Sequence, residues 1–229
     1  MKLAIMQPYF LPYIGYWQLI YAVDKFVVYD DVNYIKSGWI NRNNILSNGK
    51  KQLFTVKLSG ASSFKLINQI TVIDDFAKFT RMLQQNYQKA PRFKEVMALV
   101  SEILDFNKDN LALFILNSIR IITEYLEIDT ELLLSSDLEK DTFLKAQEKV
   151  IDICARLKAT EYYNAIGGKE LYSTKDFRDR GIDLKFLKTN FVPYSQFGKE
   201  FVAGLSILDV LMFNEIETIR EMLGDYSFE

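Results

Sequence analysis

The sequence predicts an α/β fold with a doubly wound, mostly parallel sheet. Short apolar runs alternate with segments whose apolar residues recur every three or four positions, the pattern of strands separated by helices. The first such unit has a strand over 3–6, a helix over 16–22 and a strand over 25–30, which is typical of a βαβ crossover. Its first strand ends at Gln7-Pro8, because proline cannot continue a central strand.

The later elements extend this alternation. Further strands are expected over 52–58, 131–135, 161–164 and 183–187, and further helices over 142–157, 206–214 and 215–223. Asp141 or Thr142 is the expected N-cap of the helix over 142–157. The segment 74–126 has helical spacing with breaks near Ala90-Pro91 and Phe106-Asn107, so it is interpreted as a helical insertion or subdomain. Residues 39–48 are polar and rich in turn formers. We therefore expect one Rossmann-like α/β domain over 1–229.

Composition narrows the chemistry. The chain has no histidine and a single cysteine, Cys154. Ser-His-Asp and Cys-His catalysis, the usual zinc sites and an internal disulfide are therefore excluded. Proton transfer must use a carboxylate, a lysine, a tyrosine or a group of the substrate. Cys154 lies in an apolar helical pattern and is expected to be a buried thiol.

Charge and hydropathy indicate the surroundings. The net charge is −2 and no basic block occurs, which argues against nucleic acid as a partner. The N-terminal apolar run is too short for a signal peptide, and no stretch approaches the roughly 20 apolar residues of a membrane span. We expect a cytoplasmic protein.

The first candidate site is the loop after the strand over 3–6. Prolines stiffen it, and Gly15 lies where the next helix should begin, so that free N–H groups and the helix dipole favour a phosphate. Two tyrosine hydroxyls, three residues apart, are expected to converge on one ligand. The alternative is a rigid aromatic turn packed on the sheet edge. The expected ligand-binding residues are Gln7, Tyr9, Tyr13, Gly15 and Tyr16.

The second candidate site follows the strand over 25–30. Adjacent acids at a strand end can hold Mg²⁺ or orient a substrate amine or hydroxyl, and nearby cations can steady a phosphate or carboxylate. The alternative is a solvated loop with surface salt bridges. The expected catalytic residues are Asp30, Asp31, Lys36 and Arg42, with Asp30 and Asp31 as candidate Mg²⁺ ligands; the expected binding residues are Asn33, Trp39, Asn41 and Asn43.

The third candidate is the turn of Gly167, Gly168 and Lys169 after the strand over 161–164. Free amides plus a cation suit a phosphate. The P-loop pattern is not met, because Lys169 is followed by glutamate, and a helix start that needs glycine explains the turn equally well. Farther on, Ser206 is expected to cap a helix that Asp209 strengthens.

Several of these segments resemble the WbqC-like family. They are Met6-Gln7-Pro8-Tyr9-Phe10, Pro12-Tyr13-Ile14-Gly15-Tyr16, Tyr29-Asp30-Asp31-Val32, Trp39-Ile40-Asn41-Arg42-Asn43, the glycine turn near Gly168 and residues 201–209. The resemblance implies an association with O-antigen and other surface-polysaccharide gene clusters. It also implies transfer of glycine or another amino acid to an amino sugar, without an established catalytic residue to carry over.

A second, weaker likeness concerns the fold. The segment Tyr13-Ile14-Gly15-Tyr16 at a helix start is similar to the H-x-G-H motif of a nucleotidyltransferase superfamily. In that superfamily the histidines hold ATP phosphates, and enzymes such as pantothenate synthetase join an acid to an amine through an adenylate. Tyrosine occupies both histidine places here and cannot carry the imidazolium charge. Positive charge would have to come from Lys36, Arg42 or Lys169.

Together these observations lead to three hypotheses. The first is a transferase of surface-polysaccharide biosynthesis that attaches an amino acid to an amino sugar or a nucleotide-linked amino sugar by amide formation, with ATP and Mg²⁺ as the implied cofactors. The second is a non-catalytic module that binds a nucleotide sugar or a partner enzyme. The third is a nucleotidyltransferase-like hydrolase.

Overall fold

A computed structural model describes residues 1–198 and 200–229. Its centre is a mixed six-stranded sheet with the order β10-β9-β8-β1-β2-β7. All pairs are parallel except β9–β10, in which Tyr226 lies opposite Thr189. The strands are β1 (Lys2–Met6), β2 (Lys25–Val28), β7 (Glu131–Leu134), β8 (Glu161–Ala165), β9 (Asp183–Thr189) and β10 (Tyr226–Phe228).

The later strands of the sheet lie on both sides of β1. The chain moves outward through β2 to β7 on one side, then returns to pair β8 with the other side of β1 before it continues to β9. The carboxyl ends of β1 and β8 therefore flank the point where the strand order reverses. In open α/β sheets this point is where a crevice forms.

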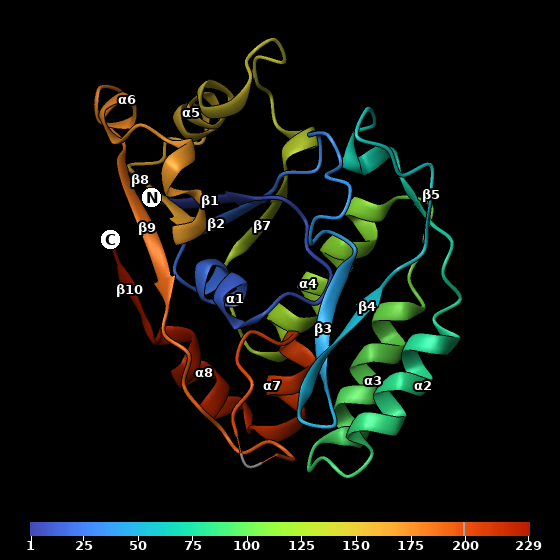
Figure 1. Ribbon diagram of the computed structural model, residues 1–229. Helices are drawn as coiled ribbons and strands as arrows, with labels where there is room; N and C mark the ends of the chain where they lie inside the picture. The colour runs from blue at the N-terminus through green and yellow to red at the C-terminus, as the bar shows by residue number, and fades with distance from the viewer. Residues whose placement is uncertain (199) are drawn as a thin grey trace.

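Helices cover both faces of the sheet (Figure 1). Successive residues of β1 point to opposite faces: Leu3 and Ile5 belong to one apolar cluster, and Ala4 belongs to the other. The first cluster lies under α5 (Ala146–Arg156) and α6 (Thr174–Arg178), and the second under α1 (Ile14–Tyr21), α4 (Leu111–Tyr125), α7 (Ile207–Phe213) and α8 (Ile216–Gly224).

The connection from β2 to β7 contains all the structure on the right of Figure 1. It comprises the hairpin of β3 (Arg42–Ser47) and β4 (Lys50–Thr55), the pair β5 (Leu58–Ser59) and β6 (Thr71–Val72), and helices α2 (Ala77–Tyr87), α3 (Phe93–Leu104) and α4. The helix breaks fall near Pro91 and Asn107 as predicted. Phe10, after β1, stacks on Phe114 of α4 at 5.4 Å between centroids, so this region shares the core of the sheet.

Three local expectations differ from the structure. Residues 42–47 form strand β3, which pairs with β4 through a turn at Asn48 and Gly49, both with positive φ, the geometry of a tight hairpin. Helix α5 begins at Ala146 rather than near Thr142, because the Asp141 carboxylate accepts the Phe143 N–H within a local turn. The C-terminal strand β10 was not anticipated. Ser206 does cap α7, accepting the Leu208 N–H at 3.3 Å.

Candidate functional site

A cavity of about 410 Å³ opens at the carboxyl ends of β1 and β8. Three segments form its wall: the end of β1 with the loop and helix that follow, the loop after β2, and the last residue of β8. The lining residues are Met6, Gln7, Pro8, Tyr9, Tyr13, Gly15, Tyr16, Leu19, Ile35, Gly38, Trp39, Ile40 and Ala165. Its position at the strand-order reversal and its volume are those of a small-molecule site. We call it the aromatic cavity.

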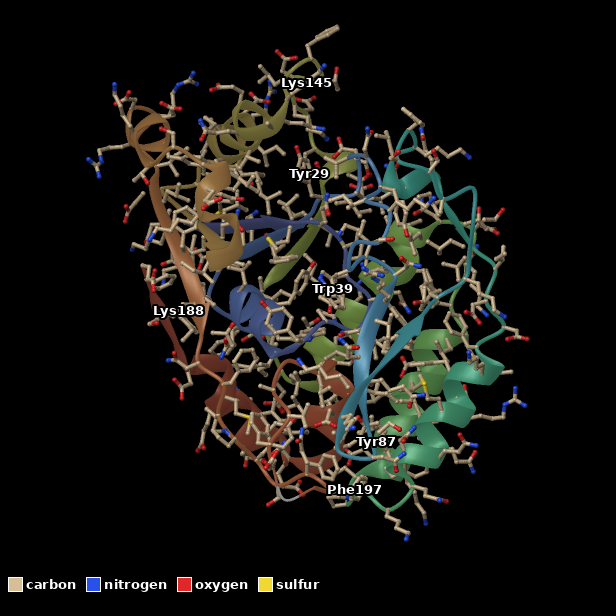
Figure 2. The ribbon with its side chains drawn as sticks, viewed as in Figure 1. Tyr29, Trp39, Tyr87, Lys145, Lys188 and Phe197 are labelled. Carbon is tan, nitrogen blue, oxygen red and sulfur yellow. The ribbon has the colours of Figure 1, made fainter. Side chains whose placement is uncertain are left out.

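Four aromatic side chains give the aromatic cavity its character. Tyr9 lies 6.1 Å from Tyr16 at 85° and 6.3 Å from Trp39 at 39°, measured between ring centroids. Trp39 is half exposed and lies between α1 and the β3–β4 hairpin in Figure 2. None of the described lining residues carries a charge. The aromatic cavity therefore suits a neutral, flat group better than an ion.

Local hydrogen bonds hold this wall in place. The buried Tyr16 hydroxyl donates to the Gln7 carbonyl at 3.0 Å, and burial raises the pKa of Tyr16. Gln7 is a lining residue of the aromatic cavity, and its side-chain amide makes no hydrogen bond with the described residues. Burial also raises the pKa of Tyr9 and of Tyr13. All three phenols are therefore neutral near pH 7 and act as donors or stacking faces.

Comparisons with known proteins assign the chain to a family. Residues 7–221 match the WbqC-like protein family. The chain belongs to that family. The uncharacterized protein Rv1507c of Mycobacterium tuberculosis is 33% identical over 218 residues, which is 93% of each chain. No solved structure matches.

The structure brings the residues of the first candidate site together at the aromatic cavity. All five residues expected there, Gln7, Tyr9, Tyr13, Gly15 and Tyr16, line the wall. The structure gives a reason for glycine at position 15 that differs from the expected phosphate contact. An added Cβ would lie 2.2 Å from Thr189 Oγ1 and 2.4 Å from a Tyr13 ring carbon. Glycine at this position therefore leaves room for the side chains of Thr189 and Tyr13.

The paired acids of the second candidate site do not line the aromatic cavity. Asp30 is buried, and its carboxylate accepts the Ser136 N–H at 2.9 Å and the Asn68 amide at 3.0 Å. Neither Asp30 nor Asp31 lines the aromatic cavity. The acids of the second candidate site therefore do not join Tyr13 and Tyr16 in the aromatic cavity, because Asp30 ties the end of β2 to the segment before β6 and to the segment after β7.

Asp31 is part of a buried ion cluster. Its Oδ2 lies 3.1 Å from Lys140 Nζ and 3.0 Å from Lys149 Nζ. Burial would raise the pKa of Asp31, but the ammonium groups of the two lysines hold it below the usual value. Two ammonium groups on one oxygen do not fit a Mg²⁺ ligand, and the described residues contain no group of three or more metal-ligating side chains of the His, Cys, Asp and Glu kind.

Arg42 contacts the aromatic cavity indirectly. Its guanidinium lies 5.4 Å from the Trp39 ring centroid, and its Nε donates to the Gly38 carbonyl at 2.7 Å. It also donates to the Ser37 carbonyl. These contacts fix the loop that presents Trp39, and the cation–π contact orients the indole. Lys36 and Asn33 are exposed on the same loop.

The two buried asparagines of the segment have structural partners. Asn41 accepts the Tyr34 hydroxyl and donates to the Val56 carbonyl, each at 2.8 Å. Asn43 donates to the Leu11 carbonyl at 2.5 Å. Asn43 thus joins β3 to the loop after β1, and neither asparagine lines the aromatic cavity.

The glycine turn does not extend the aromatic cavity. Gly167, Gly168 and Lys169 lie in a 3₁₀ helix over Ile166–Leu171. Lys169 is exposed, and its Nζ lies 3.5 Å from Glu229. An added Cβ at Gly168 would come within 3.1 Å of the Asn164 side chain. Only Ala165, just before this turn, reaches the wall.

Sequence reasoning also missed part of the site and its support. The apolar wall residues Leu19, Ile35 and Ile40 carry no chemical signal that separates them from core residues. The buried Asp209 accepts hydrogen bonds from Tyr87 at 2.7 Å and Tyr194 at 2.6 Å instead of strengthening the helix cap.

Every described helix is too short or too polar to span a membrane.

Proposed function

We propose that the chain is a transferase of surface-polysaccharide (O-antigen) biosynthesis. Its acceptor is an amino sugar carried on a nucleotide, and it joins glycine or another amino acid to the amino group as an amide. The observation that carries the proposal is the aromatic cavity at the reversal of strand order, the place where a Rossmann-like sheet binds nucleotides. Membership of the WbqC-like family supports the biological setting.

Amide formation requires an activated carboxyl group and a neutral amine. ATP is the proposed source of activation, because a free amino acid carboxylate does not react with an amine. The carboxylate would displace pyrophosphate from ATP to form an acyl-adenylate, and the amine would then displace AMP to form the amide. Of the four residues first considered catalytic, Lys36 lies on the loop that carries Trp39 and Arg42 is the first residue of β3. These two are the proposed cations for phosphate or carboxylate. Positioning of the two reactants beside the aromatic cavity would supply much of the rate.

The test is a product assay. Protein incubated with ATP, Mg²⁺, glycine and a panel of UDP- or dTDP-amino sugars is expected to yield a nucleotide sugar heavier by one glycine residue, detected by mass spectrometry. Replacing the amino sugar with its hydroxyl counterpart is the matched control and should give no amide. Folded protein that yields no product across the panel contradicts the transferase proposal.

One observation favours a second candidate, a non-catalytic nucleotide-sugar binding module. The wall of the aromatic cavity has no charged side chain, and Asp30 and Asp31 are engaged in buried contacts. Such a module would bind the same nucleotide sugars without turnover and without ATP consumption. Measuring ATP consumption with and without the amine also distinguishes the transferase from a hydrolase, which would release AMP or pyrophosphate without the acceptor.

A further inference from the structure

We infer that the aromatic cavity is the nucleobase subsite of this protein: the base stacks on Tyr9 and Trp39, the Gln7 side-chain amide reads its hydrogen-bonding edge, and the phosphates remain outside. The inference rests on the proposed nucleotide-linked substrate and assigns the part of that substrate that enters the aromatic cavity.

The absence of charge in the wall decides which end of a nucleotide sugar can enter. A diphosphate inside would lose its hydration without gaining a counter-charge from any described lining residue, and burying an unpaired charge is strongly unfavourable. A cation does lie beside the wall, since the Arg42 guanidinium is 5.4 Å from the Trp39 ring centroid. Phosphates are therefore expected at the mouth and an uncharged group within.

The hydrogen-bonding groups of the cavity wall favour a base over a sugar ring as the uncharged group inside. Each hydroxyl of a buried sugar needs a partner. The Tyr16 hydroxyl is already bonded to the Gln7 carbonyl, and the Tyr13 hydroxyl lies beside Thr189. The Gln7 amide and the Tyr9 hydroxyl are the side-chain groups left to bond a ligand. A flat ring with its polar atoms on one edge matches this supply, whereas a polyhydroxylated ring does not.

The groups that would hold the base are also pre-positioned. The Gln7 backbone is fixed by the Tyr16 hydroxyl and by the proline that follows it, which restricts its conformation. Its amide offers one donor and one acceptor side by side, as bidentate recognition of adenine or of a uracil-like imide requires. Tyr9 and Trp39, 6.3 Å apart between centroids, supply aromatic faces on which any base can stack.

The experiment measures binding of neutral nucleosides without the sugar. Wild-type protein is titrated with uridine, thymidine, adenosine and inorganic pyrophosphate, each followed by calorimetry and by tryptophan fluorescence. Trp17 is fully buried and Trp39 is half exposed, so Trp39 should give the response. At least one nucleoside is expected to bind, with an affinity nearly constant between about 0.1 and 1 M salt, where the Debye length falls from about 10 to 3 Å.

Substitutions test the named contacts. Trp39→Ala is expected to weaken nucleoside binding roughly 5- to 150-fold, the range of base–aromatic stacking, and Trp39→Phe should retain most of the affinity. Gln7→Glu, which replaces the amide donor by an acceptor, should change the order of preference among the nucleosides. Leu53→Ala is the matched control, since Leu53 is as exposed as Trp39 but lies outside the aromatic cavity.

The outcomes distinguish this inference from the proposed function. Nucleoside binding without any acylated product would contradict the transferase and leave the nucleobase subsite standing. Acylated product whose formation is inhibited by pyrophosphate but by no nucleoside, or nucleoside binding that is unchanged in Trp39→Ala, would overturn the nucleobase subsite and leave the transferase standing.

Discussion

Gly15→Ala tests whether the packing of α1 against β9 determines the shape of the aromatic cavity. Two effects oppose each other. Alanine is favoured over glycine in a helix by about 1 kcal/mol. Against this, the new Cβ would lie 2.2 Å from Thr189 Oγ1 and 2.4 Å from a Tyr13 ring carbon, and overpacking costs about 1–3 kcal/mol. Because two neighbours must move, we take a cost of about 2–3 kcal/mol and expect a net loss of about 1–2 kcal/mol.

The assay is urea denaturation followed by far-ultraviolet circular dichroism, together with the ligand titrations. Gly167→Ala is the control, since an added Cβ there meets nothing within 4 Å and should change the free energy of unfolding by less than about 0.5 kcal/mol. Adding Thr189→Ala to Gly15→Ala removes one clash and should restore part of the loss. Unchanged or increased stability of Gly15→Ala would refute the reasoning, as would a double variant no more stable than the single one.

Three further predictions concern buried groups outside the aromatic cavity. Asp31→Asn leaves two buried ammonium groups without their carboxylate and should cost about 3–5 kcal/mol at pH 7 by urea denaturation, whereas Asp137→Asn, on the exposed surface, should cost little. Because the pKa of Asp31 is lowered by folding, its contribution is complete above about pH 4 and is lost as the pH falls through the folded-state pKa; wild type should therefore lose more stability on acidification than Asp31→Asn. Tyr87→Phe removes a hydrogen bond to the buried carboxylate of Asp209 and should cost about 1–3 kcal/mol in the same assay, and a near-neutral effect would contradict that contact. Burial raises the pKa of Cys154 to about 12, so a thiol reagent should label it only after unfolding; rapid labelling of native protein would disprove its burial.

The sequence predicted the alternation of the parallel strands with helices, because these signals are local. Apolar runs stopped by Gln7-Pro8 and by the acids after Val28 locate the parallel strands, and Pro91 and Asn107 locate the helix breaks. The hairpin β3–β4 was partly missed, because β3 carries the polar Arg42, Asn43 and Asn44. Their partners are distant in sequence, so no local pattern reveals them.

Only part of the candidate site could be predicted, because some of its contacts are local in sequence and others are not. The loop after β1 could be recognised because prolines, glycine and tyrosines are concentrated there, and it does line the aromatic cavity. Asp30 and Asp31 looked equally functional, but an acidic pair at a strand end is compatible with a ligand site or an internal ion cluster. Whether Asp31 belongs to a ligand site or to an ion cluster depends on Lys140 and Lys149. These lysines are more than one hundred residues away in the sequence and meet Asp31 only in the folded chain.

The most direct test of the account is a crystal structure of the protein soaked with a nucleotide-linked amino sugar. We expect density inside the aromatic cavity, with the base against Trp39 and within hydrogen-bond distance of Gln7, and the phosphates toward Arg42. Density for the ligand at Gly167–Lys169 or beside Asp31, with the aromatic cavity empty, would contradict the account.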